Sequence, residues 1–365
     1  QLGDDDCALF AALPNLRMVA FTNAKIGKAC LQALAGAPGL TSVTLSTTEV
    51  EPGSIATLAA AAAIDSLSFS DVRGLSPADI GALTPLRRLR FFSVGFTMIP
   101  VGRTPWHDDR MLAEIAKLTS IQTMTISRVA AGPEGMAKIA AMPALRELTL
   151  TYGLFGDGAV APLAGAKLTT LNINQNYRLG PATAASVAKI PTLAYLDLSN
   201  TGVGGGLAPL AGLTQLSTLT LNGSFVTDAD LKAVSTLPTL TTLNVHDNPS
   251  VGDPGFTAVT GIKSLKTVSL GRTAITDAGF ATLLEMPALQ SVYAAENAFT
   301  DAFTAAAAKS RVTNIDVSGS DLTDAGLAAL AKVATLTTAS VRQTRVSDAG
   351  VSAAKAARAN FNVYK

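Results

Sequence analysis

The chain has 365 residues, of which 48% are hydrophobic and 15% are charged, and this composition excludes an intrinsically disordered protein. The 28 lysines and arginines nearly balance the 27 aspartates and glutamates, so neither nucleic acid nor an anionic membrane is expected as a partner. Two cysteines and no apolar run of about 18 residues predict neither a disulfide-dense scaffold, nor a CxxC metal site, nor a membrane span.

The first predicted element is a capping helix within residues 1–15. Its central part, Asp4–Leu13, is expected to turn Cys7, Phe10 and Leu13 inward. A cap is needed because the first unit of a repeat array would otherwise expose its core. Cys7 falls at nearly the same helical phase as Cys30 in the next predicted helix. The two thiols either form a disulfide or lie free in the core, and the sequence leaves both interpretations open.

From Leu16 onward the chain repeats the pattern Leu-x-x-Leu-x-Leu. The first apolar position returns at intervals of 22 to 25 residues, with one interval of 35. These positions, which define fourteen predicted coils, are Leu16, Leu40, Ile64, Leu86, Ile121, Leu145, Leu168, Leu193, Leu216, Leu240, Leu265, Leu289, Val312 and Leu336. Such self-similarity predicts stacked units around one continuous core, not two or three separate domains.

Each coil has the same three parts. The segment Leu240–Val245 alternates apolar and polar residues, which predicts a short strand with one buried face. A short polar residue near the ninth position is expected to bond to backbone groups of the following turn. These residues are Asn176, Thr201, Asn248, Thr273, Asn297, Ser320 and Thr344. A Thr/Ser-Asp-Ala-Gly segment, as in Leu322–Leu327, then predicts a helix start with a capping hydroxyl and a carboxylate at the positive end of the helix dipole.

With these in-phase motifs the chain resembles the leucine-rich repeat family, in particular its bacterial type with a 24-residue repeat and a Thr-Asp-Ala-Gly-Leu segment. The resemblance covers residues 1–365. It implies a single α/β solenoid domain of about fourteen coils, a horseshoe with a parallel concave sheet and short helices on the convex side. The spacing of about 4.8 Å between strands, against about 8–10 Å between packed helices, predicts the same direction of bend. Residues 353–365 are expected to form the C-terminal cap.

Positions 2, 3, 5 and 7 of each strand are expected to face the concave solvent, where most residues are small, neutral and hydroxylated. This surface either binds a neutral polymer or a weak partner, or it reflects only the preference of Thr and Ser for exposed strands. Four larger side chains are spread over the eighth, tenth and twelfth coils: Tyr195, Asp197, His246 and Tyr293. A separation of about 10 Å suits a spread binding surface and is too large for a catalytic dyad.

The fourth coil departs from this pattern. Its predicted concave residues are Arg87, Arg88, Arg90 and Phe92, and the long interval follows them. The extra residues lie within an insertion at 96–110, which contains Arg103, Trp106 and Arg110. Inserted loops of repeat proteins often carry function, and arginine with tryptophan is typical of interface hot spots. The insertion is therefore interpreted either as a protein or anionic-ligand site, or as a loop that Trp106 anchors to the array.

No catalytic or cofactor motif accompanies the repeats. His107 and His246 have no nucleophile and carboxylate at a motif spacing, and the consecutive residues of His107–Asp109 do not suit a metal site. The sequence therefore predicts no enzyme, no cofactor and no metal.

The predicted function is a non-catalytic module that binds a protein, or a neutral polysaccharide, through the concave face and the coil-four insertion. The alternative is a structural component of an envelope or extracellular assembly that self-associates as a homo-oligomer. A chain that begins at Gln1 and has few lysines suits an extracytoplasmic protein of the periplasm, cell surface or medium, although a cytoplasmic location also fits.

Overall fold

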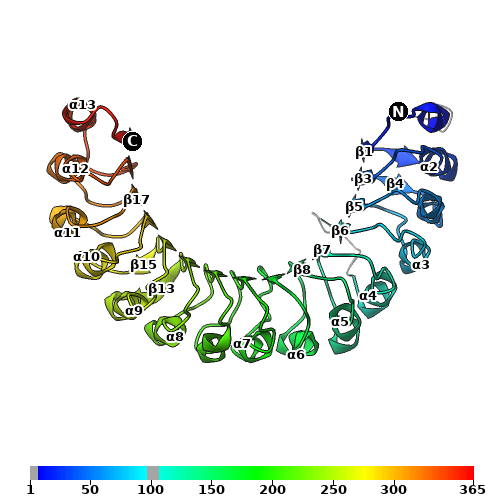
Figure 1. The fold of residues 1–365 in the computed structure, drawn as a ribbon, viewed down its shortest axis with the longest axis horizontal. Coiled ribbons are helices and arrows are strands. Elements are labelled where there is room, and N and C mark those ends of the chain that lie inside the picture. Colours follow the sequence, from blue (N-terminus) through cyan, green and yellow to red (C-terminus); the bar gives the residue numbers. More distant parts are fainter. Residues whose placement is uncertain (1–6, 97–106) are drawn as a thin grey trace. The chain divides into compact units, whose positions relative to one another are not determined.

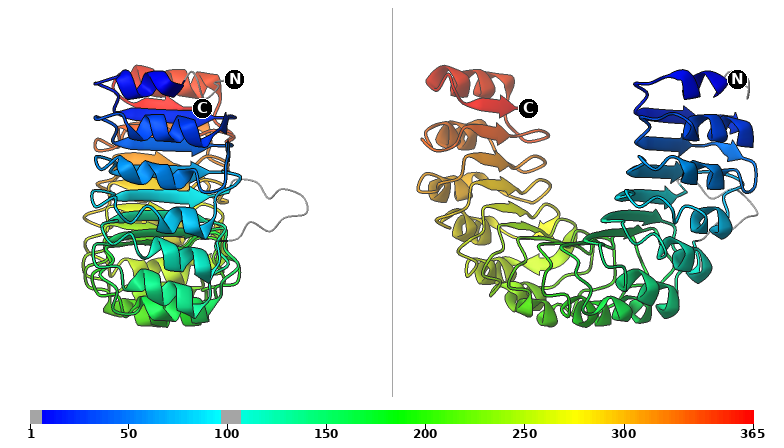
Figure 2. Two further views of the ribbon diagram at one scale, coloured as in Figure 1. Left: turned by 90° about the vertical axis from the view of Figure 1, so that its right-hand side faces the viewer. Right: turned by 45° about the vertical axis from the view of Figure 1, so that its right-hand side comes forward.

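The computed structural model describes residues 7–96 and 107–365. It divides into two compact units, residues 1–178 and residues 179–365. In each unit, short parallel strands line one side and short helices line the other (Figure 1). Figure 2 shows the same order within each unit, with one strand and one helix in most coils. The predicted α/β solenoid is confirmed.

In the described part of the first unit, seven strands pair in parallel and in chain order. They are β1 (Met18–Thr22), β3 (Ser42–Ser46), β5 (Ser66–Ser70), β6 (Phe91–Gly95), β7 (Thr123–Ser127), β8 (Glu147–Thr151) and β9 (Thr170–Asn172). The helices are η1 (Ala8–Ala12), α2 (Lys28–Ala35), η2 (Ile55–Ala60), α3 (Pro77–Gly81), α4 (Asp109–Ile115), α5 (Pro133–Ala140), α6 (Asp157–Val160) and η3 (Ala161–Leu163). A small parallel pair follows the first two strands and consists of β2 (Lys25–Ile26) and β4 (Glu49–Val50).

The second unit, all of which is described, continues the pattern with eight strands in chain order. They are β10 (Tyr195–Asp197), β11 (Thr218–Thr220), β12 (Thr242–Asn244), β14 (Thr267–Ser269), β16 (Ser291–Tyr293), β17 (Asn314–Asp316), β18 (Thr338–Ser340) and β19 (Asn362–Tyr364). Its helices are α7 (Ala182–Val187), η4 (Ala208–Gly212), α8 (Asp228–Val234), α9 (Asp253–Val259), α10 (Asp277–Leu284), η5 (Asp301–Phe303), α11 (Thr304–Ala307), α12 (Asp324–Ala331) and α13 (Asp348–Ala357). A second small pair consists of β13 (Asn248–Gly252) and β15 (Thr273–Ala274).

The repeated apolar residues form the core because the strands alternate between two faces. In β12, Leu243 is fully buried while Thr242 and Asn244 are half-buried on the strand face. Neighbouring coils place equivalent residues side by side, so that Leu243 pairs in register with Leu219 on one side and Val268 on the other. Each coil therefore covers the apolar face of the next, as a repeat array requires.

Buried asparagines join each coil to the one before it. The side chain of Asn248 is fully buried, and its Nδ2 donates to three carbonyl oxygens at 2.9 to 3.1 Å. Its Oδ1 accepts from the backbone N–H groups of Ser224 and Val226 in the preceding coil, at 3.1 and 2.9 Å. Asn176 and Asn297 make the same kind of contacts. The predicted bonding of turn backbone groups is confirmed at these positions.

A left-handed residue follows the strand in most coils and turns the chain out of the sheet. Asn200 and Asp247 have this conformation, with φ of 54° and 62°, and glycine occupies the position at Gly223. Short polar residues and glycine tolerate it best. Arg128 and Tyr152 also adopt it, with φ of 59° and 54°. Two large side chains are therefore held at the edge of the strand face, as are the polar side chains of Arg272, Glu296 and Gln343, which share this conformation.

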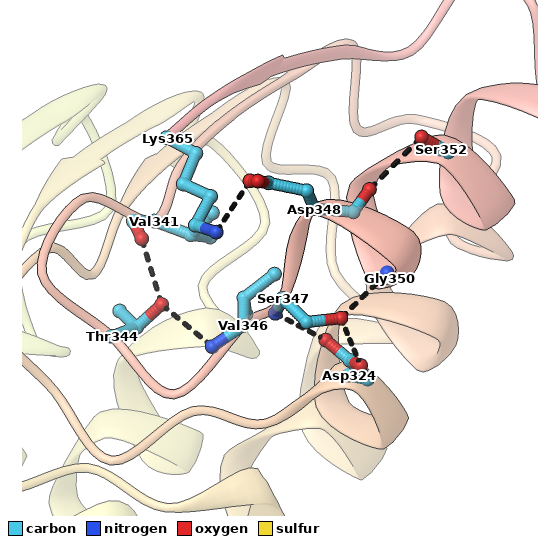
Figure 3. A network of polar contacts seen from close by, with 9 residues as sticks. All are labelled: Asp324, Val341, Thr344, Val346, Ser347, Asp348, Gly350, Ser352 and Lys365. Atoms are coloured by element: carbon cyan, nitrogen blue, oxygen red, sulfur yellow. Dashed lines mark hydrogen bonds and ion pairs between the residues drawn. The ribbon is translucent and has the colours of Figure 1, made fainter.

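The Thr-Asp-Ala-Gly segment links successive helices. Thr276 caps α10, since its hydroxyl accepts from the N–H of Ala278, as the sequence predicts. Asp253, from the previous helix, accepts from the backbone N–H and the hydroxyl of Thr276 at 2.8 and 2.6 Å. A Cβ atom on Gly279 would lie 2.1 Å from the Oδ1 of Asp253, so the glycine makes room for the contact. Asp277, Asp301 and Asp324 repeat it, the last with Ser347 (Figure 3).

At the start of the described chain, Cys7 and Cys30 form a disulfide that ties the segment of η1 to α2. Phe10 packs edge-on against Phe21, with ring centroids 6.1 Å apart. The prediction that Leu13 points inward was wrong, because η1 ends at Ala12 and Leu13 continues as exposed extended chain. The predicted helical residues 1–6 lie outside the described residues.

The C-terminal segment supplies a fifteenth strand, β19, within the residues expected to form the C-terminal cap. β19 pairs in parallel with β18. Val363 of β19 and Phe361, the residue before it, are buried. The Nζ of Lys365 lies 2.6 Å from the Oδ1 of Asp348 (Figure 3). Asp348 is the first residue of α13 and corresponds to Asp277 and Asp324, which we call, with Asp253 and Asp301, the ladder aspartates. A lysine thus meets the carboxylate that, in the preceding coils, meets the cap of the following helix.

Candidate functional site

The fourth coil has a different register from the predicted one. β6 pairs Phe91 with Ser66 and Phe92 with Leu67, so Leu89 and not Leu86 holds the first position. Phe92 was predicted to face the concave solvent and is instead core, with 2% of its surface exposed. Phe91 takes the third position and is 52% exposed. The error arose because Leu86 and Leu89 are themselves spaced as Leu-x-x-Leu, while the true fourth position is a phenylalanine.

The arginines of this coil are displaced by the same three residues. Arg87 and Arg88 lie in the turn before β6, and the N–H of Arg90 bonds to the carbonyl of Asp65 at 2.8 Å just before the strand begins. The third and fifth positions, predicted for Arg88 and Arg90, belong to Phe91 and Ser93. All three arginines are exposed: Arg87 and Arg88 lie in the turn before the strand, whereas Arg90 takes the second position of the coil, one of those expected to face the concave solvent.

The insertion is described only at its two ends, and Arg103 and Trp106 lie outside the described residues. Phe96 and His107 stack with ring centroids 5.3 Å apart and an interplanar angle of 18°. Burial lowers the pKa of His107 to about 4, although the charge of Asp108 acts in the opposite direction. The buried imidazole is therefore neutral at physiological pH and serves as an apolar anchor for this end of the insertion.

The acidic residues after His107 have structural partners. Asp108 caps α4 and lies 2.7 Å from the Nη2 of Arg110. Its burial would raise the pKa of Asp108, but the hydrogen bonds from Arg110 and the helix N-terminus outweigh this and lower it. Asp109 accepts from the N–H of Gly132 at 2.7 Å, as the ladder aspartates do. Arg110, a predicted site residue, is thus paired within its own helix start.

A group of exposed apolar side chains lies beside the insertion, at the side of the first unit where the strands end. These side chains are Tyr152, Leu154 and Tyr177, and together with the neighbouring Arg128 we call them the aromatic edge. The three apolar residues are 49%, 39% and 71% exposed and come from two successive coils. The Arg128 guanidinium lies 5.8 Å from the ring centroid of Tyr152, and its Nε donates to the carbonyl of Phe96 at 3.0 Å. Contacts therefore run from the insertion anchor to Tyr152.

The sequence analysis missed the aromatic edge because it considered only strand positions 2, 3, 5 and 7. Tyr152 holds the eighth position of its coil, and Leu154 and Tyr177 hold the tenth. A comparison of the eighth and tenth positions would have found the aromatic side chains, although the eighth position also carries large polar residues such as Arg272 and Glu296. Large apolar residues at exposed turn positions indicate a contact surface better than strand positions do.

The second predicted cluster is only partly exposed. Tyr195 and Asp197 lie on β10, His246 follows β12, and Tyr293 ends β16, so the four remain spread across several strands. Asp197 was expected on the solvent face but is buried and accepts from the N–H of Ser199 at 2.9 Å. Burial, and then the charge of Asp197, raises the pKa of Tyr195. The structure brings no two of the four into a catalytic pair.

Among residues 7–96 and 107–365, no three His, Cys, Asp or Glu side chains come together as a metal site. A search of the same residues finds no helix with the length and apolar character to cross a bilayer.

Known proteins share the fold. The family model described as Leucine Rich repeat matches residues 236–259 and 312–331. No curated protein sequence matches the chain. An internalin from Listeria monocytogenes is 18% identical with a TM-score of 0.64, and the match covers 93% of this chain and 88% of the internalin. A leucine-rich repeat protein of Leptospira interrogans is 12% identical with a TM-score of 0.55, over 97% and 91% of the two chains.

A structure of the TLR13–ssRNA13 complex is also similar, with 15% identity and a TM-score of 0.59. That match covers 94% of this chain but only 55% of the other. At these identities the likeness concerns the fold alone. The in-phase repeats, the two matched segments and the stacked strands and helices together show that the chain contains leucine-rich repeats and has the fold of leucine-rich repeat proteins.

Proposed function

We propose that the chain is a non-catalytic module that binds a protein partner, and that the aromatic edge is its main contact surface. The observation that carries the proposal is the exposure of Tyr152, Leu154 and Tyr177 in two neighbouring coils next to Arg128. Tyrosine and arginine are enriched among residues that dominate binding energy. An exposed apolar group of this kind on an otherwise hydroxylated surface is typical of an interaction site.

Two further features support the proposal. Tyr152 is ordered by its contact with Arg128, so little side-chain freedom is lost when a partner covers it. The hydroxyl of Tyr177 donates to Gln175 in the same turn, which orients the second ring. The edge also adjoins the insertion, whose Phe96 and His107 pack against one another. A partner that covers the edge would therefore lie next to Phe96, the first residue of the insertion predicted from the sequence as a binding segment.

Site-specific photo-crosslinking tests this surface. A photoreactive phenylalanine placed at Tyr177 should trap a discrete partner in the native source, identified by mass spectrometry. The same residue placed at Thr282, a half-buried position on α10 of the second unit, should trap much less. Replacing Tyr152 with Ser should then weaken capture from Tyr177 at least tenfold. Phe225, which is 76% exposed at the equivalent turn position of the second unit, provides the matched variant Phe225→Ser, and an equal loss in it would contradict the proposal.

A neutral polysaccharide is the second candidate ligand, and the strand face of the second unit favours it. Tyr195 and Tyr293 flank β11, β12 and β14, whose outward residues carry hydroxyl and amide groups. Aromatic rings beside such groups suit a neutral sugar chain. Affinity electrophoresis in neutral polysaccharide gels tests this: retardation that Tyr293→Ala abolishes would support the candidate, and unchanged mobility would refute it.

We further propose an extracytoplasmic location, supported by the Cys7–Cys30 disulfide, because such bonds persist in oxidising compartments. Alkylation of the protein in its native source tests the location. If both Cys7 and Cys30 react with the alkylating reagent without prior reduction, the proposed location is refuted. The self-associating structural role is tested by light scattering of the purified chain, where a monomer at micromolar concentration would exclude it.

A further inference from the structure

His107 is a buried titratable residue with an unpartnered ring nitrogen. The residue is 3% exposed, and within residues 7–96 and 107–365 no group forms a hydrogen bond with its Nε2. Buried polar atoms almost always have a hydrogen-bond partner, so this exception needs an explanation. The ring stacks instead on Phe96, with centroids 5.3 Å apart. The imidazole is therefore held by an apolar contact that suits only its neutral form.

A chain of contacts connects this stack to the aromatic edge. The N–H of His107 donates to the carbonyl of Arg128 at 3.2 Å, and its own carbonyl accepts from the N–H of Ala130 at 3.1 Å. The carbonyl of Phe96 accepts from the Nε of Arg128 at 3.0 Å. The guanidinium of Arg128 lies 5.8 Å from the ring centroid of Tyr152. The residue that stacks on His107 therefore also positions the arginine that contacts Tyr152.

We propose that the stack of Phe96 on His107, which we call the histidine latch, makes the aromatic edge sensitive to acid. Protonation of His107 opens the stack and frees Phe96, so that Arg128 leaves its position over Tyr152. The regulatory meaning of this change rests on the proposed function, in which the aromatic edge contacts a protein partner. The opening of the latch itself does not depend on that function.

The direction of the pH dependence follows from burial. A protonated imidazole carries a charge and donates from both nitrogens, and the latch offers no acceptor to Nε2 among the described residues. Burial lowers the pKa of His107 to about 4 in the closed latch, whereas an exposed imidazole has its ordinary pKa of 6.5. The closed form is therefore fully favoured above pH 6.5. As the pH falls toward 4, the open form alone takes up a proton and gains in population.

The size of the effect follows from the same two pKa values. The ratio of open to closed molecules should rise about 30-fold from pH 7.5 to pH 5. Minor conformers of folded proteins are commonly populated at up to about 10%. With about 3% of the molecules open at pH 7.5, a 30-fold rise opens about half of them at pH 5.

The charged groups around the latch do not reverse this direction. They lie in the preceding coil, at the start of α4 and in the following coil, and they are Asp71, Arg73, Asp108, Asp109, Arg110 and Arg128. The charge of Asp108 raises the pKa of His107, but burial has the larger effect. Hydrogen bonds from Arg110 and the helix N-terminus lower the pKa of Asp108, so this carboxylate stays ionised at pH 5. Its attraction is therefore the same over the range in which the latch opens.

Hydrogen exchange of the full chain tests the latch without a partner. The N–H of Ala130 reports on opening, because it bonds to the carbonyl of His107. After correction for the intrinsic pH dependence of exchange, its protection should fall at least tenfold from pH 7.5 to pH 5. The fall should stay below threefold in His107→Phe, which keeps an aromatic ring against Phe96 but takes up no proton. The N–H of Asp321, bonded to Phe299 in the second unit, is the control and should change less than threefold in both chains.

Nuclear magnetic resonance of the chain with ¹³C-labelled tyrosine rings tests the connection to the aromatic edge. The resonance of Tyr152, assigned by its loss in Tyr152→Phe, should shift between pH 7.5 and pH 5 in the unmodified chain and not in His107→Phe. Arg128→Met removes the bond to Phe96, so the pH-dependent shift should disappear while the exchange of Ala130 still depends on pH. Circular dichroism confirms that each variant folds, and His107→Leu replaces His107→Phe if the latter does not.

The proposal is overturned if the protection of Ala130 falls less than tenfold, or falls equally in the variant without the histidine. It is also overturned if the Tyr152 resonance does not shift with pH, or shifts equally in Arg128→Met. The proposed function fails separately. A chain that captures no partner from Tyr177 at pH 7.5 would refute the contact surface and leave the latch intact, whereas a failed latch leaves capture at pH 7.5 unchanged.

Discussion

Replacing Gly279 with Ala should destabilise the second unit, although glycine-to-alanine changes inside helices usually stabilise. Gly279 lies in the first turn of α10, where the helix preference for alanine alone would add up to about 1 kcal/mol. The new Cβ would, however, lie 2.1 Å from the Oδ1 and 2.7 Å from the Cγ of Asp253. The carboxylate must move away and give up its contacts with Thr276.

The magnitude follows from the two hydrogen bonds that are lost. Asp253 accepts from the N–H and hydroxyl of Thr276, and at a half-buried site each bond contributes about 1 kcal/mol net. Together with the strain of crowding, this loss exceeds the gain in helix preference. We expect Gly279→Ala to lower the free energy of unfolding by about 1 to 2 kcal/mol.

The Asp253→Ala background separates this steric cause from other effects, because the clashing carboxylate is then absent. In that background Gly279→Ala should become neutral or stabilising by up to about 1 kcal/mol. Gly158 in α6 provides a matched control, since a Cβ there would meet nothing within 4 Å and Gly158→Ala should stabilise. Urea unfolding followed by far-ultraviolet circular dichroism measures the free energy of unfolding of these four variants (Gly279→Ala, Asp253→Ala, the double variant and Gly158→Ala) and of the unmodified chain. The reasoning is refuted if Gly279→Ala lowers the free energy of unfolding by the same amount in the unmodified chain and in the Asp253→Ala background.

Three further outcomes are expected. Asn248→Ala should lower the free energy of unfolding by at least about 3 kcal/mol in urea titration, because it leaves buried N–H and C=O groups without partners; a loss below 1 kcal/mol would contradict this. Since burial lowers the pKa of His107 from 6.5 to about 4, the unfolded chain alone takes up a proton between these values. Stability should be full above pH 6.5 and about 2 kcal/mol lower at pH 5, a loss absent from His107→Leu. The double variant Cys7→Ala/Cys30→Ala should lose about 3 kcal/mol, the chain-entropy value for a sequence separation of 23, and reduction should then have no further effect.

The repeat was predictable from the sequence because the same residue pattern recurs in every coil. A strand of alternating residues such as Leu240–Val245 is ambiguous alone, but equivalent segments recur in register about 24 residues apart. The turn asparagines and helix caps were predictable for the same reason. What each motif contacts was less accessible. The aspartate of the Thr/Ser-Asp-Ala-Gly segment was assigned to its own helix dipole, while the carboxylate of Asp277 in such a segment accepts hydrogen bonds from Thr300 in the next coil. A single motif does not reveal which copy its side chain reaches.

The candidate sites escaped prediction where the repeat is least regular. In the fourth coil, two overlapping Leu-x-x-Leu spacings were available, and only the pairing of Phe92 with Leu67 decides between them. That shift of three residues moved Arg87 and Arg88 into the turn before the strand and gave Arg90 the second position. In a solenoid whose coils are nearly interchangeable, a ligand can be recognised only where coils differ, so departures from the repeat are the residues to mutate first.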